Sequence, residues 1–219
     1  MLKIIGLSLI LADMVRKKEN PVYMIGPAAI LSYLIYQKLP ENIRTEIKQE
    51  FSGTILGKPV KQRIEIVRNI DDRVRKIREL IDKGKQDYTI RQIAGEIVQD
   101  IPEKDYKSEI LAIANYVKGN VRYTKDIAGM DTYQHPVRTL ELGIGDCDCI
   151  SALLCSLLES IGHETALKVV QTKGHDDYNH IYPLVRLDSK WIPIDLTVNK
   201  PIGWEVPKSQ VIKEKIYEG

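Results

Sequence analysis

The sequence has little of several features that mark particular protein classes. Its 219 residues include three cysteines, Cys147, Cys149 and Cys155, an odd number confined to one short segment. A disulfide framework needs paired cysteines spread along the chain, so this pattern excludes a disulfide-rich secreted domain and favours a reducing compartment. The formal net charge is only +2, which is not the basic excess of a nucleic-acid-binding protein. We therefore expect no nucleic-acid partner.

Long hydrophobic runs are also lacking. Met1–Ala12 is almost wholly apolar, and Val22–Tyr36 is a second apolar run interrupted by Gly26 and Pro27, but both are too short to span a bilayer. No signal-peptide cleavage site is evident before Asp13. We expect residues 1–38 to pack as helices against the main domain, an oligomer or a protein assembly, and favour this over membrane association. The expected location is cytoplasmic or virion-associated.

The length suits one domain with an extension. Composition and linker signals predict an apolar helical arm and linker over residues 1–52 and a main domain over 53–210. Within the main domain, we expect a helical lead-in over 53–118 and the functional core over 119–200. Residues 211–219 are expected to be a C-terminal tail.

Hydrophobic spacing predicts three helical regions in the lead-in. One amphipathic helix or two lie between Val60 and Leu80, and further helices run over Thr89–Val98 and Tyr106–Lys118. The charges of the first region alternate in sign, which indicates a solvated face. After Val121 and Tyr123 the sequence predicts an irregular loop through Gly129 and Asp131 to Pro136, and loops of such length are often functional.

The cysteines open a segment that turns into an apolar helix. Leucines recur after Cys147 at three- and four-residue intervals, and Gly162 follows the expected helix end. A cysteine in the first turn lies near unpaired backbone N–H groups and the positive end of the helix dipole, both of which favour thiolate. This ranks Cys147 first as a nucleophile and Cys149 second, and makes Cys155 a core residue.

A hairpin follows the cysteine helix. Thr165–Gln171 reads as a strand, and strands 180–187 and 190–197 flank the two residues Asp188 and Ser189. With a two-residue loop, Tyr182 pairs with Asp195, and His180 is a diagonal neighbour of that aspartate on the same face. A slip of one residue would separate the two side chains, so the contact depends on the turn.

Cys147, His180 and Asp195 are therefore the predicted catalytic residues. A thiolate attacks an acyl carbon, an imidazole takes and returns the proton, and a carboxylate fixes the imidazole tautomer. The N–H of Cys147 is the natural first oxyanion donor, and the Gln134 side chain is a weaker candidate for the second, against an exposed loop glutamine. His135, His163 and His175 compete with His180 as the base.

A structural zinc site is the weaker alternative for the cysteines. Its ligands would be Cys147, Cys149, Cys155 and His163, but the spacing lacks a CxxC pair. Thiolate chemistry requires no metal, and the chain has no acidic calcium loop, so no cofactor is expected.

Three motifs resemble the transglutaminase-like superfamily: residues 145–151 (GDCDCIS), 179–182 (NHIY) and 191–195 (WIPID). The resemblance covers roughly Tyr106–Thr197 and implies a papain-like α+β fold, with the cysteine helix packed on an antiparallel sheet. It also implies Cys147 as nucleophile, His180 as base and Asp195 as orienting acid. The lead-in over residues 60–102 is similar to that of short phage- and prophage-encoded members.

The resemblance implies thiol-dependent acyl transfer on amide bonds of a protein or peptide substrate. Hydrolysis by a cysteine peptidase or amidase is expected ahead of transglutaminase cross-linking. The alternative is a structural or virion-associated interaction protein that keeps the fold and docks through its apolar arm. Many relatives carry an acidic residue where this chain has Cys149, and the alternatives for this thiol are a structural substitute, a redox partner and a sign of altered catalysis. Because Cys149 is too close to Cys147 for an unstrained disulfide, we favour the structural substitute.

Overall fold

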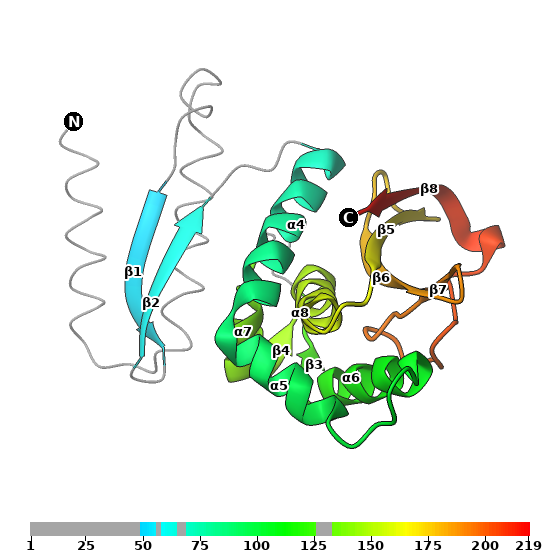
Figure 1. Ribbon diagram of the computed structural model, residues 1–219. Helices are drawn as coiled ribbons and strands as arrows, with labels where there is room; N and C mark the ends of the chain where they lie inside the picture. The colour runs from blue at the N-terminus through cyan, green and yellow to red at the C-terminus, as the bar shows by residue number, and fades with distance from the viewer. Residues whose placement is uncertain (1–48, 56–57, 65–68, 126–132) are drawn as a thin grey trace. The chain divides into compact units, whose positions relative to one another are not determined.

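The computed structural model describes residues 49–55, 58–64, 69–125 and 133–219 (Figure 1). The chain divides into two compact units, Met1–Val67 and Arg68–Gly219. In the first unit, strands β1 (Gln49–Ile55) and β2 (Lys58–Ile64) form an antiparallel hairpin. The apolar arm expected over residues 1–38 lies outside the described residues.

The hairpin corrects the prediction for the start of the lead-in. We expected helix between Val60 and Leu80, but β2 occupies the first part of that range and helix α4 begins only at Ile70. The predicted domain boundary between residues 52 and 53 falls inside β1, whereas the compact units divide between Val67 and Arg68. The helical spacing extends by chance across the true helix start, where the Asn69 side chain accepts a hydrogen bond from the N–H of Asp72.

The remaining lead-in helices agree with their predictions. Helices α4 (Ile70–Gln86), α5 (Tyr88–Val98) and α6 (Tyr106–Asn120) follow one another along the chain. Asp87 ends α4 and caps α5 by accepting from the N–H of Thr89, and Asp105 caps α6 in the same way through Ser108. At the start of each of these helices, a side chain therefore accepts a hydrogen bond from an otherwise unsatisfied backbone N–H group.

The irregular loop predicted between Tyr123 and Pro136 lies largely outside the described residues, and short regular elements flank it. Strand β3 (Arg122–Tyr123) pairs in parallel with β4 (Ile144–Gly145), and helix α7 (Pro136–Leu142) lies between them in sequence. Proline is well suited to the first helical position, and Gly143 ends α7 in the left-handed conformation, with φ of 65°. This short parallel pair delivers the chain directly to the cysteine helix.

Helix α8 (Cys147–Ser160) is the centre of the second unit, and every residue from Cys147 to Leu158 is buried. Its leucines pack against α5 and α6, while Ala152 and Cys155 pack against α4 and the sheet. A helix that is apolar around its whole circumference is one that other elements surround. Figure 1 shows α8 between the other helices and the sheet.

The sheet contains strands β5 (Thr165–Thr172), β6 (His180–Leu187), β7 (Lys190–Pro193) and β8 (Val211–Glu218). All neighbours are antiparallel in the order β7-β6-β5-β8, and the sheet is curled (Figure 1). The predicted C-terminal tail is wrong, because β8 pairs with β5 along its length. The α+β fold with a cysteine helix on an antiparallel sheet is confirmed.

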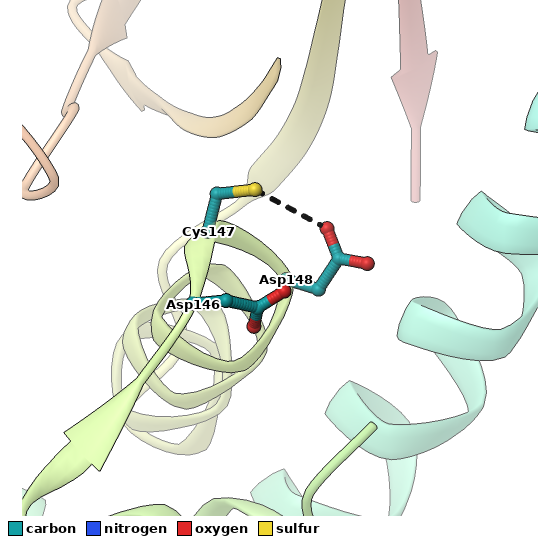
Figure 2. A group of neighbouring side chains, drawn as sticks. All are labelled: Asp146, Cys147 and Asp148. Atoms are coloured by element: carbon teal, nitrogen blue, oxygen red, sulfur yellow. Dashed lines mark hydrogen bonds between the residues drawn. The ribbon is translucent and has the colours of Figure 1, made fainter. Parts of the chain in front are cut away.

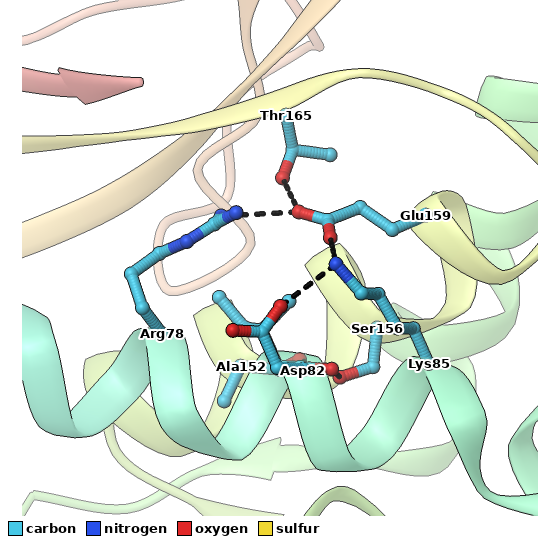
Figure 3. Close-up of polar contacts among 8 residues, drawn as sticks. Arg78, Asp82, Lys85, Ala152, Ser156, Glu159 and Thr165 are labelled. Atoms are coloured by element: carbon cyan, nitrogen blue, oxygen red, sulfur yellow. Dashed lines mark hydrogen bonds and ion pairs between the residues drawn. The ribbon is translucent and has the colours of Figure 1, made fainter. Parts of the chain in front are cut away.

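Ion pairs join α8 to α4, and a hydrogen bond joins it to the sheet. The largely buried carboxylate of Glu159 accepts from Arg78 and Lys85 of α4 and from the Thr165 hydroxyl, at 2.6 to 3.0 Å (Figure 3). These contacts tie the end of α8 to both neighbours, while the cysteine lies at its other end. Among the helices that the structure describes, none has both the length and the apolar character needed to cross a membrane.

Candidate active site

Cys147 is the first residue of α8, as predicted. The preceding residue, Asp146, caps the helix by accepting from the N–H of Cys149 at 2.9 Å. Only 6% of Cys147 is exposed, and the backbone N–H of Ile181 on β6 hydrogen-bonds to its sulfur. The helix start and the beginning of β6 therefore meet at the thiol.

The electrostatic surroundings of the thiol differ from those we predicted. Burial raises the pKa of Cys147 well above its ordinary value, and the carboxylates of Asp148 and Asp146 raise it further. Arg73 and the Ile181 N–H act in the opposite direction but do not outweigh them. The prediction that the helix start favours a thiolate at Cys147 is therefore wrong for this state, because burial and two adjacent negative charges act against ionisation and outweigh Arg73 and the Ile181 N–H.

Asp148 connects the thiol to helix α4. The Cys147 thiol donates to Asp148 Oδ1 over 3.6 Å, as Figure 2 shows. The same carboxylate accepts two hydrogen bonds of 2.8 Å from Arg73, through Nε and Nη2. Arg73 Nη2 also lies 4.0 Å from the sulfur. Sequence reasoning missed Arg73, because the alternating charges of its helix indicated a solvated face.

His180 and Asp195 are in contact, as the hairpin register predicted. His180 Nε2 lies 2.7 Å from Asp195 Oδ2, and both side chains are largely buried. Asp188 and Ser189 form the two-residue turn with positive φ, and Leu187 pairs with Lys190. The turn residues therefore fix the register that brings the imidazole to the carboxylate.

The environment of Asp195 keeps its carboxyl ionised. Burial acts to raise the pKa of Asp195, but hydrogen bonds from His180 and Thr197 outweigh burial, so the pKa lies below its ordinary value. Thr197 donates to Oδ1 through its N–H at 3.0 Å and through its hydroxyl at 2.7 Å. The other oxygen is thus left to receive the imidazole N–H.

Gln134 forms its hydrogen bonds with residues other than Cys147. Its side-chain oxygen accepts from the Thr139 hydroxyl at 3.5 Å, and its backbone N–H hydrogen-bonds to the sulfur of Cys149. These contacts hold the Gln134 segment against the start of α8. The oxyanion role of its side chain stays a prediction.

The competing histidines have other surroundings. His163 Nε2 lies 2.8 Å from Glu109 Oε2, and His175 is exposed in the loop between β5 and β6. His135 immediately precedes α7, and burial lowers its pKa. Of the four histidines, His180 is the one whose next residue donates its N–H to the Cys147 sulfur.

The structure contradicts the zinc alternative. Cys147 is at the start of α8 and His163 follows its end, so the helix of 14 residues separates them by about 20 Å at 1.5 Å per residue. In the described part of the chain, ligand atoms of Asp146, Cys147 and Asp148 do lie within 4.8 Å of one another (Figure 2). Asp148 is already paired with Arg73 and Asp146 caps the helix, so we assign no metal site there.

Residues 91–196 match the model of the transglutaminase-like superfamily. Curated protein sequences give no match. Among solved structures, a candidate protease from Parabacteroides distasonis is 12% identical with a TM-score of 0.49, covering 68% of this chain and 36% of its own.

Two further structures give similar values. A candidate cysteine protease from Cytophaga hutchinsonii is 16% identical with a TM-score of 0.46, covering 65% of this chain and 51% of its own. A structure described as a TGase is 15% identical with a TM-score of 0.38, covering 78% of this chain and 50% of its own. The chain thus spans between about a third and a half of these structures. The segment that matches the model of the transglutaminase-like superfamily, residues 91–196, thus carries the cysteine helix, His180 and Asp195.

Proposed function

We propose that the protein is a thiol-dependent acyltransferase acting on amide bonds, chiefly as a cysteine peptidase or amidase. Cys147 is the nucleophile, His180 the general base and acid, and Asp195 the orienting carboxylate. One observation carries the proposal: the strand that holds His180 against Asp195 also donates the next N–H, that of Ile181, to the Cys147 sulfur. Thiol, imidazole and carboxylate are thus linked through adjacent groups.

The contact with Asp195 determines which nitrogen of the His180 imidazole donates a hydrogen bond and which accepts one. Because the Asp195 carboxylate is ionised, His180 Nε2–H donates to it, and Nδ1 is left as the acceptor for the thiol proton. The sulfur then attacks the amide carbon, and the N–H of Cys147 is oriented to meet the developing oxyanion. His180 returns the proton to the departing amine or ammonia, leaving a thioester.

Water then resolves the thioester in the hydrolytic reaction. His180 Nδ1 takes a proton from the water molecule, whose oxygen attacks the thioester carbon, and the Cys147 sulfur leaves with its proton restored. An amine in place of water would give cross-linking. The resting thiol is protonated because its pKa is raised, so proton transfer to His180 accompanies attack on a bound substrate.

The test is incubation of the full chain with a mixture of proteome-derived peptides and a dansyl-labelled primary amine, read by mass spectrometry. A peptidase produces new peptide termini, an amidase produces deamidated glutamine or asparagine, and a cross-linking enzyme attaches the dansyl amine. We expect one of the first two products with the native chain. Cys147→Ala should abolish it, and His180→Ala should lower its rate by about 10²–10⁴-fold.

The matched control is His175→Ala, which removes an exposed loop histidine. This variant should keep the native rate. Absence of all three products from the native chain, or equal rates in the native chain and Cys147→Ala, would contradict the proposal.

The second candidate is an interaction protein that keeps this fold and docks through its apolar arm over residues 1–38. The observation that favours it is the burial and raised pKa of Cys147, since inert structural thiols share these properties. Failure of the peptide assay with a folded protein would favour this candidate, and co-purification through residues 1–38 would then be the next measurement.

A further inference from the structure

Helix α4 lies entirely outside the segment that matches the transglutaminase-like superfamily, yet it reaches the reactive thiol. Arg73, on its first turn, is 75 residues from Asp148 in the sequence and binds both oxygens of that carboxylate at 2.8 Å. Asp148 is 1% exposed and Arg73 is 17% exposed at the side chain. A fork of two parallel hydrogen bonds in such surroundings holds the carboxylate in one orientation.

Without Arg73, the charges around the Cys147 thiol would be predominantly negative. Three elements act on the sulfur: Asp146 and Asp148 lie at the start of α8, Arg73 lies on α4, and the Ile181 N–H belongs to β6, where it follows His180. The phenols of Tyr133 and Tyr178 pack on the same cluster of side chains. The guanidinium is the positive charge that offsets the two carboxylates at the sulfur.

Arg73 Nη2 is placed to respond when the thiol ionises. It donates to Asp148 Oδ1, the oxygen that also accepts from the thiol, and it lies 4.0 Å from the sulfur itself. Once the thiol proton has moved to His180, Oδ1 loses that donor and the sulfur becomes negative. The same nitrogen then faces an anion on either side, which lowers the energy of the thiolate.

We infer that Arg73 is a positioning residue of the reactive cysteine, which orients and neutralises Asp148 and keeps a positive charge beside the sulfur. This inference rests on the proposed function of Cys147 as nucleophile. It makes α4 part of the catalytic unit, so the unit is larger than the segment that matches the superfamily.

The test is the rate of Cys147 alkylation by iodoacetamide between pH 6 and 10, followed by peptide mapping of the full chain. Arg73→Met removes the charge and keeps an unbranched side chain, but it takes the guanidinium away from a buried carboxylate and so endangers folding. The decisive comparison is therefore between Asp148→Asn and the double variant R73M/D148N, neither of which contains that carboxylate.

A charge effect and an access effect give different profiles. Easier access of iodoacetamide to the thiol multiplies the alkylation rate equally at every pH. Loss of a positive charge instead moves the inflection of the pH–rate profile, which is the pH at which half of the thiol is ionised. We expect the inflection of Asp148→Asn below that of the native chain, and that of R73M/D148N about 1–3 pH units above that of Asp148→Asn. R73K/D148N should fall between the two, because lysine keeps the charge without the fork.

The matched control is R75M/D148N. Arg75 is exposed on the same helix and pairs with Asp72 and Glu79 of α4, so its loss should leave the inflection of Asp148→Asn in place. Coincident inflections for Asp148→Asn and R73M/D148N would overturn the inference. The peptide assay tests the proposed function separately, because loss of product formation does not affect a comparison of alkylation inflections.

Discussion

Cys149 lies two residues after the nucleophile and is fully buried. Its thiol hydrogen-bonds to the Asp146 carboxylate, its sulfur accepts from the N–H of Gln134, and its own N–H donates to Asp146. Burial and Asp146 raise its pKa, so the group stays a neutral thiol. These contacts favour a structural task, which is to hold the Gln134 segment against the start of α8.

Replacement of Cys149 tests that task. Cys149→Ala removes a buried side chain together with two hydrogen bonds, so the free energy of unfolding should fall by about 1–3 kcal/mol. Cys149→Ser retains a donor and an acceptor and should lose less. Urea unfolding measures both changes. If alanine and serine destabilise equally, the hydrogen bonds of the thiol contribute nothing and the structural interpretation is reduced to packing.

Residues of the site differ in how far sequence could identify them. His180 and Asp195 belong to one hairpin, so a two-residue turn and strand periodicity were enough to predict their contact. Arg73 and Asp148 are joined by tertiary packing alone, which leaves no spacing signal. The protonation of Cys147 was predicted wrongly because it depends on burial and on neighbouring carboxylates that a helix pattern does not reveal.

At the scale of elements, the close approach of α4 and α8 depends on Gly84. A Cβ atom at this position would lie 2.4 Å from Ser156 Oγ and 2.6 Å from Pro136 Cγ. Ser156 has little freedom to withdraw, because its hydroxyl donates to the carbonyl oxygen of Ala152 at 2.7 Å. Figure 3 shows Ser156 on α8 beside α4. The missing side chain therefore lets the two helices meet.

Gly84→Ala should consequently destabilise the protein although alanine is the better helix former. The helical gain of about 1 kcal/mol is opposed by an overpacking cost of about 1–3 kcal/mol. Gly95→Ala on α5 is the matched control, because nothing lies within 4 Å of its Cβ position, and it should stabilise by about 0.5–1 kcal/mol. Thermal unfolding compares the two. Equal stabilisation by Gly84→Ala and Gly95→Ala would show that α8 moves away from α4 without any loss of stability.

Elements with strong local signals were predicted best. The helices α5, α6 and α8 follow from hydrophobic spacing, although Leu111 of α6, whose spacing predicted an inward side chain, is exposed. Strands β1 and β8 were missed, because their identity comes from pairing with β2 and β5. The middle of strand β8 is the charged run Lys213–Lys215, which resembles a solvated tail until its partner is known.

At the scale of the whole molecule, three buried thiols link stability to pH. Burial raises the pKa of Cys155 to about 12, and it raises those of Cys147 and Cys149 as well. In the unfolded chain a thiol titrates near its ordinary pKa of about 8.5. Above that pH the folded protein binds more protons than the unfolded one, so the stability that these thiols contribute is complete below about pH 8.5 and is lost as the pH rises.

The free energy of unfolding should therefore fall between pH 8.5 and 9.5, by up to about 1.4 kcal/mol per pH unit for each thiol that stays protonated. This window lies below the titration of unfolded tyrosine and lysine, at about 10. Cys155→Ala should make this slope less steep by the contribution of one thiol, because the slope depends only on the difference in bound protons between the folded and unfolded states. The cavity that the substitution leaves lowers the free energy of unfolding at every pH and does not change the slope. Both tryptophans, Trp191 and Trp204, lie in the unit Arg68–Gly219, so their fluorescence during urea unfolding under reducing conditions reports on that unit alone. Identical slopes in the native chain and Cys155→Ala would mean that the folded core does not keep this thiol protonated.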